Sequence, residues 1–147
     1  MPPESLRKQS PVLVTEDDPE LRKLLALALK RRRIEVETAA NGEEAIQFLR
    51  DHDWFVLVLD LMMPVVSGFE VVNWLAEHPD RKPRMSLVVS AMNREALQQL
   101  DPSVVNAIIF KPFDVAILAA YVKKACELEH QDRRRARIVG GDRGREH

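Results

Sequence analysis

The sequence has little cysteine, almost no net charge and no long apolar run. Its one cysteine, Cys126, has no second cysteine with which to form an internal disulfide, which suits a reducing compartment. The net charge of −1 predicts no general attraction to nucleic acids or membrane surfaces. No apolar run reaches the roughly 18 residues that a membrane-spanning helix needs, and the polar, proline-rich residues 1–11 do not resemble a signal peptide. We therefore expect a cytoplasmic protein without a membrane partner.

Several motifs of enzymes and metal proteins are also missing. Neither of the two glycine-rich fingerprints of nucleotide-binding proteins occurs, which argues against a nucleotide site. The four histidines show no metal-ligand spacing, so we expect them on the surface. Met62 and Met63 are expected to pack in a loop rather than to bind copper. What remains is a composition, 46% hydrophobic and 31% charged, that is ordinary for one globular domain.

Short apolar runs alternate with segments of helical periodicity along the chain. Strands are predicted over 12–15, 34–38, 54–59, 86–89 and 107–110, and helices over 19–33, 43–50, 69–76, 93–100 and 115–126. This alternation predicts an α/β fold with a parallel sheet and helices on both of its faces. The continuously apolar third run predicts a central strand, and the alternating second run predicts an edge strand.

The first predicted helix has a clear beginning and an unusual end. Asp18 fits the N-cap position and Pro19 the first helical position. Basic residues 30–33 close the helix, next to the negative end of its dipole. No glycine follows, so the turn after this helix lacks the commonest helix cap.

One domain is expected between two polar ends. Residues 1–10 are predicted to be a flexible leader, residues 11–130 the domain, and residues 131–147 a basic, disordered tail or the start of a linker. The arginines between 133 and 137 are expected to be solvated. A contact of these arginines with nucleic acid or an acidic partner is the less favoured alternative, so we expect no nucleic-acid partner.

Polar side chains stand where four of the apolar runs end. Glu16 and Asp17 follow the first run, Asp60 the third, Ser90 the fourth and Lys111 the fifth. Because parallel strands end at the same edge of a sheet, these side chains are expected to form one site. Three carboxylates, a hydroxyl and an amine predict a site for a divalent metal and a phosphoryl group.

These residues make the chain resemble the receiver domain of bacterial two-component response regulators. The resemblance covers residues 10–128 and depends on four motifs, namely Val12-Leu13-Val14-Thr15-Glu16-Asp17-Asp18-Pro19, Asp60-Leu61-Met62-Met63-Pro64 with Ser67-Gly68, Ser90-Ala91, and Lys111-Pro112-Phe113. It implies a flavodoxin-like, three-layer (βα)5 sandwich whose parallel sheet has the strand order 2-1-3-4-5.

The resemblance also implies how a phosphoryl group and a metal would be held. Asp60 would accept the phosphoryl group from a sensor histidine kinase or a phosphotransfer protein. Glu16 and Asp17 would bind Mg²⁺ together with Asp60, and the backbone carbonyl of Met62 would be a further ligand. The three carboxylates would balance the charges of Mg²⁺ and Lys111. Without the metal, their repulsion is expected to raise the pKa of at least one of them.

The remaining implied roles concern the response to phosphorylation. Ser90 would contact the bound phosphoryl group, Lys111 would pair with it, and movement of Ser90 would alter the surface around the fourth helix and fifth strand. The family often has Tyr or Phe three residues before the lysine, where this chain has Ile108. The form of the output movement therefore stays open. An unknown downstream protein, or a homodimer through the fourth helix, fifth strand and fifth helix, would use this surface.

Two other functions compete with a phosphoacceptor domain, which would be a signalling domain and not an enzyme. An aspartate-based phosphatase would use Asp60 as its nucleophile, but such enzymes need a second acid two residues later, where this chain has Met62. A phosphate-independent interaction module on the same fold is the second alternative, and Ile108 gives it some weight. It predicts partner binding that Asp60→Asn does not change.

Overall fold

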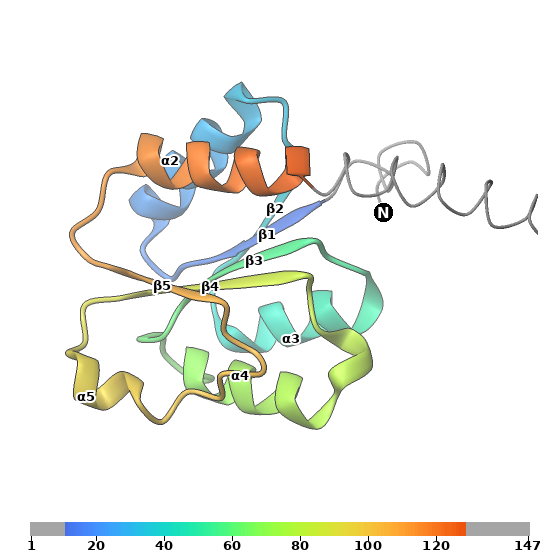
Figure 1. Cartoon of the computed structure of the whole chain (residues 1–147), viewed down its shortest axis with the longest axis vertical. Coiled ribbons are helices and arrows are strands. Elements are labelled where there is room, and N and C mark those ends of the chain that lie inside the picture. The colour runs from blue at the N-terminus through green and yellow to red at the C-terminus, as the bar shows by residue number, and fades with distance from the viewer. Residues whose placement is uncertain (1–10, 129–147) are drawn as a thin grey trace, which may run out of the picture.

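Residues 11–128 are the part of the chain that the computed structural model describes. Their five parallel strands pair in the order β2-β1-β3-β4-β5, as predicted (Figure 1). The strands are β1 (Val12–Thr15), β2 (Val36–Ala39), β3 (Val56–Asp60), β4 (Met85–Ser90) and β5 (Ala107–Phe110). The predicted leader, residues 1–10, and the predicted tail, residues 131–147, lie outside the described residues.

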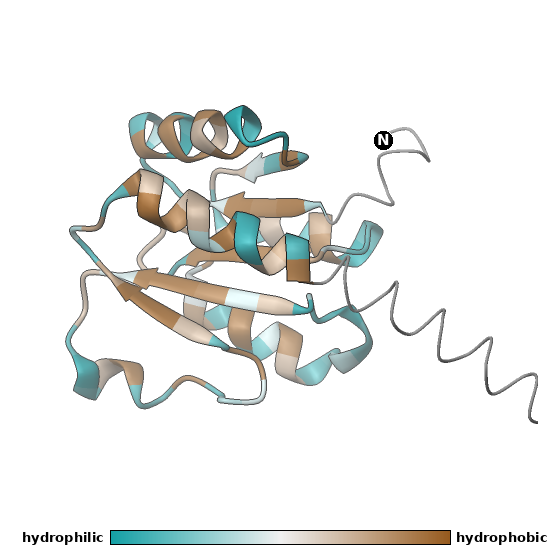
Figure 2. Ribbon diagram, turned by 45° about the horizontal axis from the view of Figure 1, so that its top comes forward, coloured by the Kyte–Doolittle hydropathy of each residue, from teal (hydrophilic) through white to brown (hydrophobic). Residues whose placement is uncertain are grey.

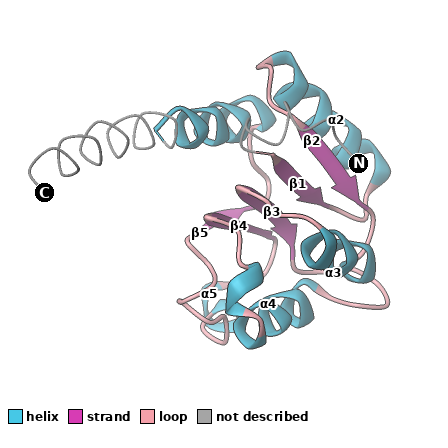
Figure 3. Ribbon diagram, turned by 90° about the vertical axis from the view of Figure 1, so that its right-hand side faces the viewer, coloured by secondary structure: helices cyan, strands magenta, loops and turns pink. Residues whose placement is uncertain are grey.

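The helices form two layers, one on each face of the sheet (Figures 1 and 3). One layer holds α2 (Pro19–Arg31) and the C-terminal helix, described over residues 115–128. The other holds α3 (Gly42–Asp51), α4 (Gly68–Glu77), α5 (Arg94–Leu97) and a short 3₁₀ helix, η1 (Pro79–Arg81). None of the helices within residues 11–128 is long and apolar enough to cross a bilayer.

The sheet separates two apolar cores, because neighbouring residues of a strand point to opposite faces. The first core lies under α2 and the C-terminal helix and includes Val12 and Val14, whereas the second lies under α3 and α4 and includes Leu13. All five residues of β3 are buried, as expected for a central strand covered on both faces. Figure 2 shows the strands mostly in the hydrophobic colour. The polar site residues therefore lie beyond these runs, at the strand ends.

Helix α2 has the start that the sequence predicts, and it ends without a glycine. The side chain of Asp18 accepts a hydrogen bond from the N–H of Glu20 at 3.0 Å, which confirms the predicted N-cap. After the C-cap residue Arg32, Arg33 has a φ of 60°, the left-handed conformation that glycine usually supplies after a helix. Arg33 therefore takes the conformation that ends α2, although no glycine follows the helix in the sequence.

The fourth helix is shorter than predicted. The sequence indicated residues 93–100, but α5 ends at Leu97. Pro102 disfavours a helical conformation for the residue before it, and the intervening residues form turns. Ile108 and Phe110, on the side of β5 opposite the first core, are consequently covered only in part and remain 36% and 40% exposed.

Val65, in the loop between β3 and α4, has a φ of 67°, which a β-branched residue rarely adopts. Its side chain is 81% exposed, so packing offsets little of this conformational cost. We expect Val65→Gly to raise the free energy of unfolding by about 1 kcal/mol, because glycine adopts this conformation easily. Urea denaturation measures the change. Val65→Ala, which keeps a Cβ, is the control, and equal stability of the two variants would contradict the explanation.

Candidate functional site

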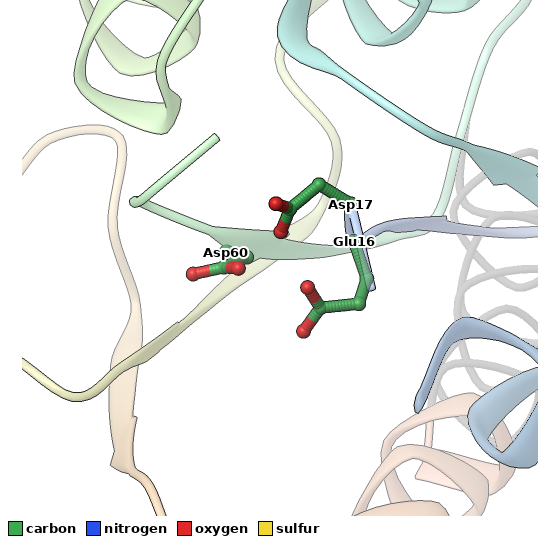
Figure 4. A group of neighbouring side chains, drawn as sticks. All are labelled: Glu16, Asp17 and Asp60. Carbon is green, nitrogen blue, oxygen red and sulfur yellow. The ribbon is translucent and has the colours of Figure 1, made fainter. Parts of the chain in front are cut away.

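The carboxyl ends of β1 and β3 bring three acids together. Glu16 and Asp17 directly follow β1, and Asp60 is the last residue of the neighbouring β3. One carboxylate oxygen from each residue lies within 4.8 Å of the others (Figure 4). The acids that the sequence singled out therefore meet at one edge of the sheet.

Two of the three acids are held in place and the third faces solvent. Glu16 is 2% exposed and Asp60 is 4% exposed, whereas Asp17 is exposed. The backbone N–H of Asp18 donates to Oε2 of Glu16 at 3.2 Å, and that of Met62 donates to Oδ1 of Asp60 at 3.1 Å. The second contact also places the backbone of Met62 beside the acids. A cation could enter on the side of Asp17.

Lys111 supplies the positive charge of this cluster. Its Nζ donates to Oε1 of Glu16 at 3.0 Å and to Oδ2 of Asp60 at 3.3 Å. Lys111 directly follows β5, so its long side chain reaches past β4 to these acids. Burial lowers its pKa, but the hydrogen bonds and charges of Glu16 and Asp60 outweigh burial and raise the pKa above its ordinary value. Lys111 is therefore a permanent cation at neutral pH.

The single positive charge of Lys111 does not balance the negative charges of the three acids. Burial, together with a side-chain hydrogen bond with Asp60, raises the pKa of Glu16 to about 7, although hydrogen bonds from Lys111 and from the N–H of Asp18 act to lower it. The sequence predicted a raised carboxyl pKa in a metal-free site, but it attributed the rise to repulsion between the acids, which contributes less here than burial. A divalent cation would relieve this excess of negative charge, so the donor set fits a hard metal ion.

The stability of the metal-free protein is expected to fall as the pH rises from about 5 to about 8. Glu16 has a pKa of 4.5 when unfolded and about 7 when folded, so between these values only the folded state holds the proton. Raising the pH removes this advantage, which is worth about 3 kcal/mol. Urea titrations in EDTA at several pH values measure it, and Mg²⁺ is expected to reduce the fall. A Glu16→Gln variant with the same pH dependence would contradict this origin.

Ser90 lies at the same edge of the sheet, where its hydroxyl oxygen accepts a hydrogen bond from the backbone. Asp60 pairs in register with Val89, so Ser90 stands one residue further along β4. Ser90 is fully buried, and its Oγ accepts a hydrogen bond from the N–H of Met92 at 2.9 Å. Its carbonyl accepts from the N–H of Lys111 at 2.8 Å. The loops that follow β4 and β5 are therefore both tied to Ser90.

Gly68 lets the loop after β3 fold back against the site. Its N–H donates to the carbonyl of Leu61 at 3.0 Å. A Cβ at this position would lie 2.4 Å from the carbonyl oxygen of Asp60, a contact that the backbone could relieve only by moving. The sequence motif includes this glycine, but the close approach was not predicted.

A pocket beside the acids was not foreseen from the sequence. It has a volume of about 460 Å³ and is lined by Asp17, Leu61, Met62, Met63, Pro64, Ser67, Phe69 and Met92. Met63 is buried in the second core, as the loop-packing expectation requires, but Met62 is 60% exposed. The only signal in the sequence was that Met62 and Met92 each follow a site residue by two positions.

Known proteins share this sequence pattern. The family described as the response regulator receiver domain matches residues 12–123. Response regulator GtcR of Aneurinibacillus migulanus is 29% identical over 126 residues, which cover 82% of this chain and 51% of GtcR. The chain thus spans about half the length of the curated relatives it matches.

Solved structures share the fold. Chemotaxis response regulator CheY4 of Vibrio cholerae superposes with a TM-score of 0.71 at 26% identity, covering 80% of this chain and 98% of CheY4. Response regulator TrrA of Thermotoga maritima, solved in complex with Mg²⁺-BeF, superposes with a TM-score of 0.67 at 28% identity, covering 79% of this chain and 98% of TrrA.

Proposed function

Since this chain belongs to the family of response regulator receiver domains, we propose that Asp60 accepts a phosphoryl group from a sensor histidine kinase or a phosphotransfer protein. One observation carries the assignment to Asp60, namely its buried carboxylate between two further acids and the ammonium of Lys111. Lys111 would neutralise charge on the transferring group, and an in-line donor needs little else from the protein.

We further propose that Glu16, Asp17 and Asp60 bind Mg²⁺, with the backbone carbonyl of Met62 as an additional ligand. Mg²⁺ prefers oxygen ligands and keeps several waters, which suits three clustered carboxylates of which Asp17 is open to solvent. The complex of TrrA with Mg²⁺-BeF supports this choice of metal. When bound, the ion would stabilise negative charge on the phosphoryl oxygens.

Phosphorylation is proposed to act through Ser90. An aspartyl phosphate adds negative charge and acceptor oxygens beside this hydroxyl. If Ser90 Oγ turns toward them, it leaves the N–H of Met92, to which it is now bonded. The loop before α5 would then shift, and with it the surface next to β5. Ser90 therefore provides a route to the output surface that does not need an aromatic residue at Ile108.

The surface that would carry the output is formed by α5, β5 and the C-terminal helix. The exposed apolar side chains of β5 and the C-terminal helix include Ile108, Phe110, Ile117 and Tyr121. We propose that a downstream protein, or a second copy of the chain, binds this surface in the cytoplasm. Sedimentation of the chain with and without Mg²⁺ and beryllofluoride tests the second case, and a monomer in both states would contradict it.

We propose that the domain is a signalling domain and does not hydrolyse other substrates. Met62 stands two residues after Asp60, where an aspartate-based phosphatase needs a second acid. Its exposed side chain offers no acid–base group to a leaving group. We expect no steady hydrolysis of small phosphomonoesters, and turnover of such a substrate would favour the phosphatase instead.

The phosphoacceptor function is tested by the intact mass of the protein after incubation with Mg²⁺ and acetyl phosphate. A species heavier by about 80 Da, the mass of one added phosphoryl group, is expected. EDTA is the control and should prevent its formation. If no phosphodonor of any class produced the adduct, the proposed function would be wrong.

A further inference from the structure

The guanidinium of Arg22 holds the backbone on both sides of Asp17. Arg22 lies near the start of α2, and its Nη1 donates to the carbonyl oxygen of Glu16 at 3.0 Å and to that of Asp17 at 3.3 Å. These carbonyls belong to the peptide groups before and after Asp17. Because each peptide group is planar, holding both of them limits the two backbone dihedrals of the residue in between.

Asp17 depends on its backbone for its orientation, because nothing holds its side chain. Its carboxylate is exposed and makes no hydrogen bond or ion pair with any of residues 11–128. The carboxylates of Glu16 and Asp60, in contrast, accept hydrogen bonds from backbone N–H groups and from Lys111. The Asp17 side chain nevertheless points toward Asp60 and joins the cluster (Figure 4). The backbone dihedrals of Asp17 therefore direct its carboxylate to the site.

Arg22 can hold this turn because its own position is fixed. Its side chain is half-buried, and its N–H donates to the carbonyl of Asp18 at 2.9 Å within α2. The other end of the turn is held by the sheet, where the N–H of Glu16 donates to the carbonyl of Ala39 at 3.1 Å. Asp17 thus lies between one anchor in β1 and a second anchor in α2.

The charge of Arg22 opposes metal binding, whereas its hydrogen bonds would favour it. A guanidinium near the acids repels a second cation, so losing the charge alone would strengthen the binding of Mg²⁺. Losing the hydrogen bonds would let Asp17 leave its place and would weaken the binding. The two effects have opposite signs, so the sign of the measured change in affinity separates them.

We propose that Arg22 is a positioning residue that holds Asp17 in place for a divalent cation and so raises the affinity of the site for Mg²⁺. The inference rests on the proposed metal site of Glu16, Asp17 and Asp60. Arg22 acts only through the two carbonyls that it binds. Without it, only a fraction of the molecules would hold Asp17 correctly, and the apparent affinity would fall by that fraction.

The test measures the dissociation constant of Mg²⁺ by titration calorimetry, without a phosphodonor. Arg22→Met removes the donors and keeps an unbranched apolar side chain, and it is expected to weaken binding about tenfold. Arg22→Lys keeps the charge and one donor group, so it should weaken binding less. Lys23→Met is the matched control, because it removes an exposed cation from the next position of the same helix. It is expected to leave the constant unchanged or slightly lower.

A second background tests whether Arg22 acts through Asp17. Asp17→Asn keeps one oxygen ligand and lowers the affinity for Mg²⁺ by itself. Adding Arg22→Met to this variant should weaken binding much less than tenfold, because correct placement of an amide gains less than placement of a carboxylate. General damage to the fold would weaken binding equally in both backgrounds.

The rate of phosphorylation by acetyl phosphate supplies a further readout. In Arg22→Met the Mg²⁺ concentration that gives half of the maximal rate is expected to rise about tenfold, while the rate at saturating Mg²⁺ stays near that of the wild type. The bound ion would then hold Asp17 in place of the missing hydrogen bonds.

The inference is overturned if Arg22→Met binds Mg²⁺ as tightly as the wild type or more tightly. It is also overturned if the loss of affinity is the same with Asp17 and with Asn at this position. Wild-type protein that binds no Mg²⁺ is a different failure, because it contradicts the proposed metal site itself.

Discussion

Asp60→Asn will abolish the phosphoryl adduct that Mg²⁺ and acetyl phosphate produce. The amide keeps the size of the side chain but lacks the carboxylate that attacks phosphorus, so the rate is expected to fall at least about a thousandfold. Because Asp60 is only 4% exposed, the isosteric change also limits disturbance of the surrounding core. Intact mass after incubation measures the loss.

An acid with a purely structural contact provides the control for this variant. Oδ1 of Asp114 accepts hydrogen bonds from the N–H groups of Ala116 and Ile117 at the start of the C-terminal helix. Asp114→Asn should therefore form the adduct at nearly the wild-type rate. Unchanged labelling of Asp60→Asn would place the phosphoryl group elsewhere and contradict the assignment.

Asp60→Asn also separates a receiver domain from a phosphate-independent interaction module. A receiver predicts that beryllofluoride or acetyl phosphate changes the affinity of wild-type protein for its downstream partner and leaves the variant unaffected. The alternative module predicts the same affinity for the wild-type protein and for the variant, whether or not beryllofluoride or acetyl phosphate is present. Titration calorimetry with the partner, once isolated, distinguishes the two outcomes.

Lys111→Met will lower the free energy of unfolding of the metal-free protein by about 3 kcal/mol at pH 8. Lys111 is the cation that contacts both Glu16 and Asp60, and its removal leaves two nearly buried carboxylates facing each other. Mg²⁺ should restore much of the loss, because a divalent ion can replace the missing charge. Urea denaturation in EDTA and in Mg²⁺ measures both effects.

Two further variants test whether the charge of Lys111 is responsible. Lys124→Met removes an exposed lysine of the C-terminal helix and should change stability little. Combining Lys111→Met with Asp60→Asn removes one of the stranded carboxylates, so the double variant should lose less than the sum of the single losses. A loss from Lys111→Met no larger than that from Lys124→Met would show that Lys111 is not the counter-charge.

The site was largely predictable because its signals are local. A polar residue at the end of an apolar run identifies the carboxyl end of a strand, and the parallel order then places Glu16, Asp60 and Lys111 at one edge. The sequence did not predict that Lys111 would contact both Glu16 and Asp60. That contact joins residues 95 positions apart and depends on the reach of one side chain across a strand.

Features that depend on contacts between distant segments were not predictable in the same way. Periodicity extended the fourth helix to residue 100, although turns replace it after Leu97. The third strand was placed over residues 54–59, but Trp54 precedes it and packs against the second core. The close approach of Gly68 to Asp60 likewise depends on how a loop folds back. None of these leaves a periodic signal in the sequence.

The division of the interior by the sheet gives each side its own spectroscopic probe. Trp54 and Trp74 pack against the second core, whereas the thiol of Cys126 is buried in the first. Tryptophan fluorescence therefore reports on the α3–α4 layer and thiol labelling on the C-terminal helix, in one sample and without engineered dyes. Coincident midpoints from both probes would identify a single cooperative transition, and separate midpoints would reveal which layer detaches first.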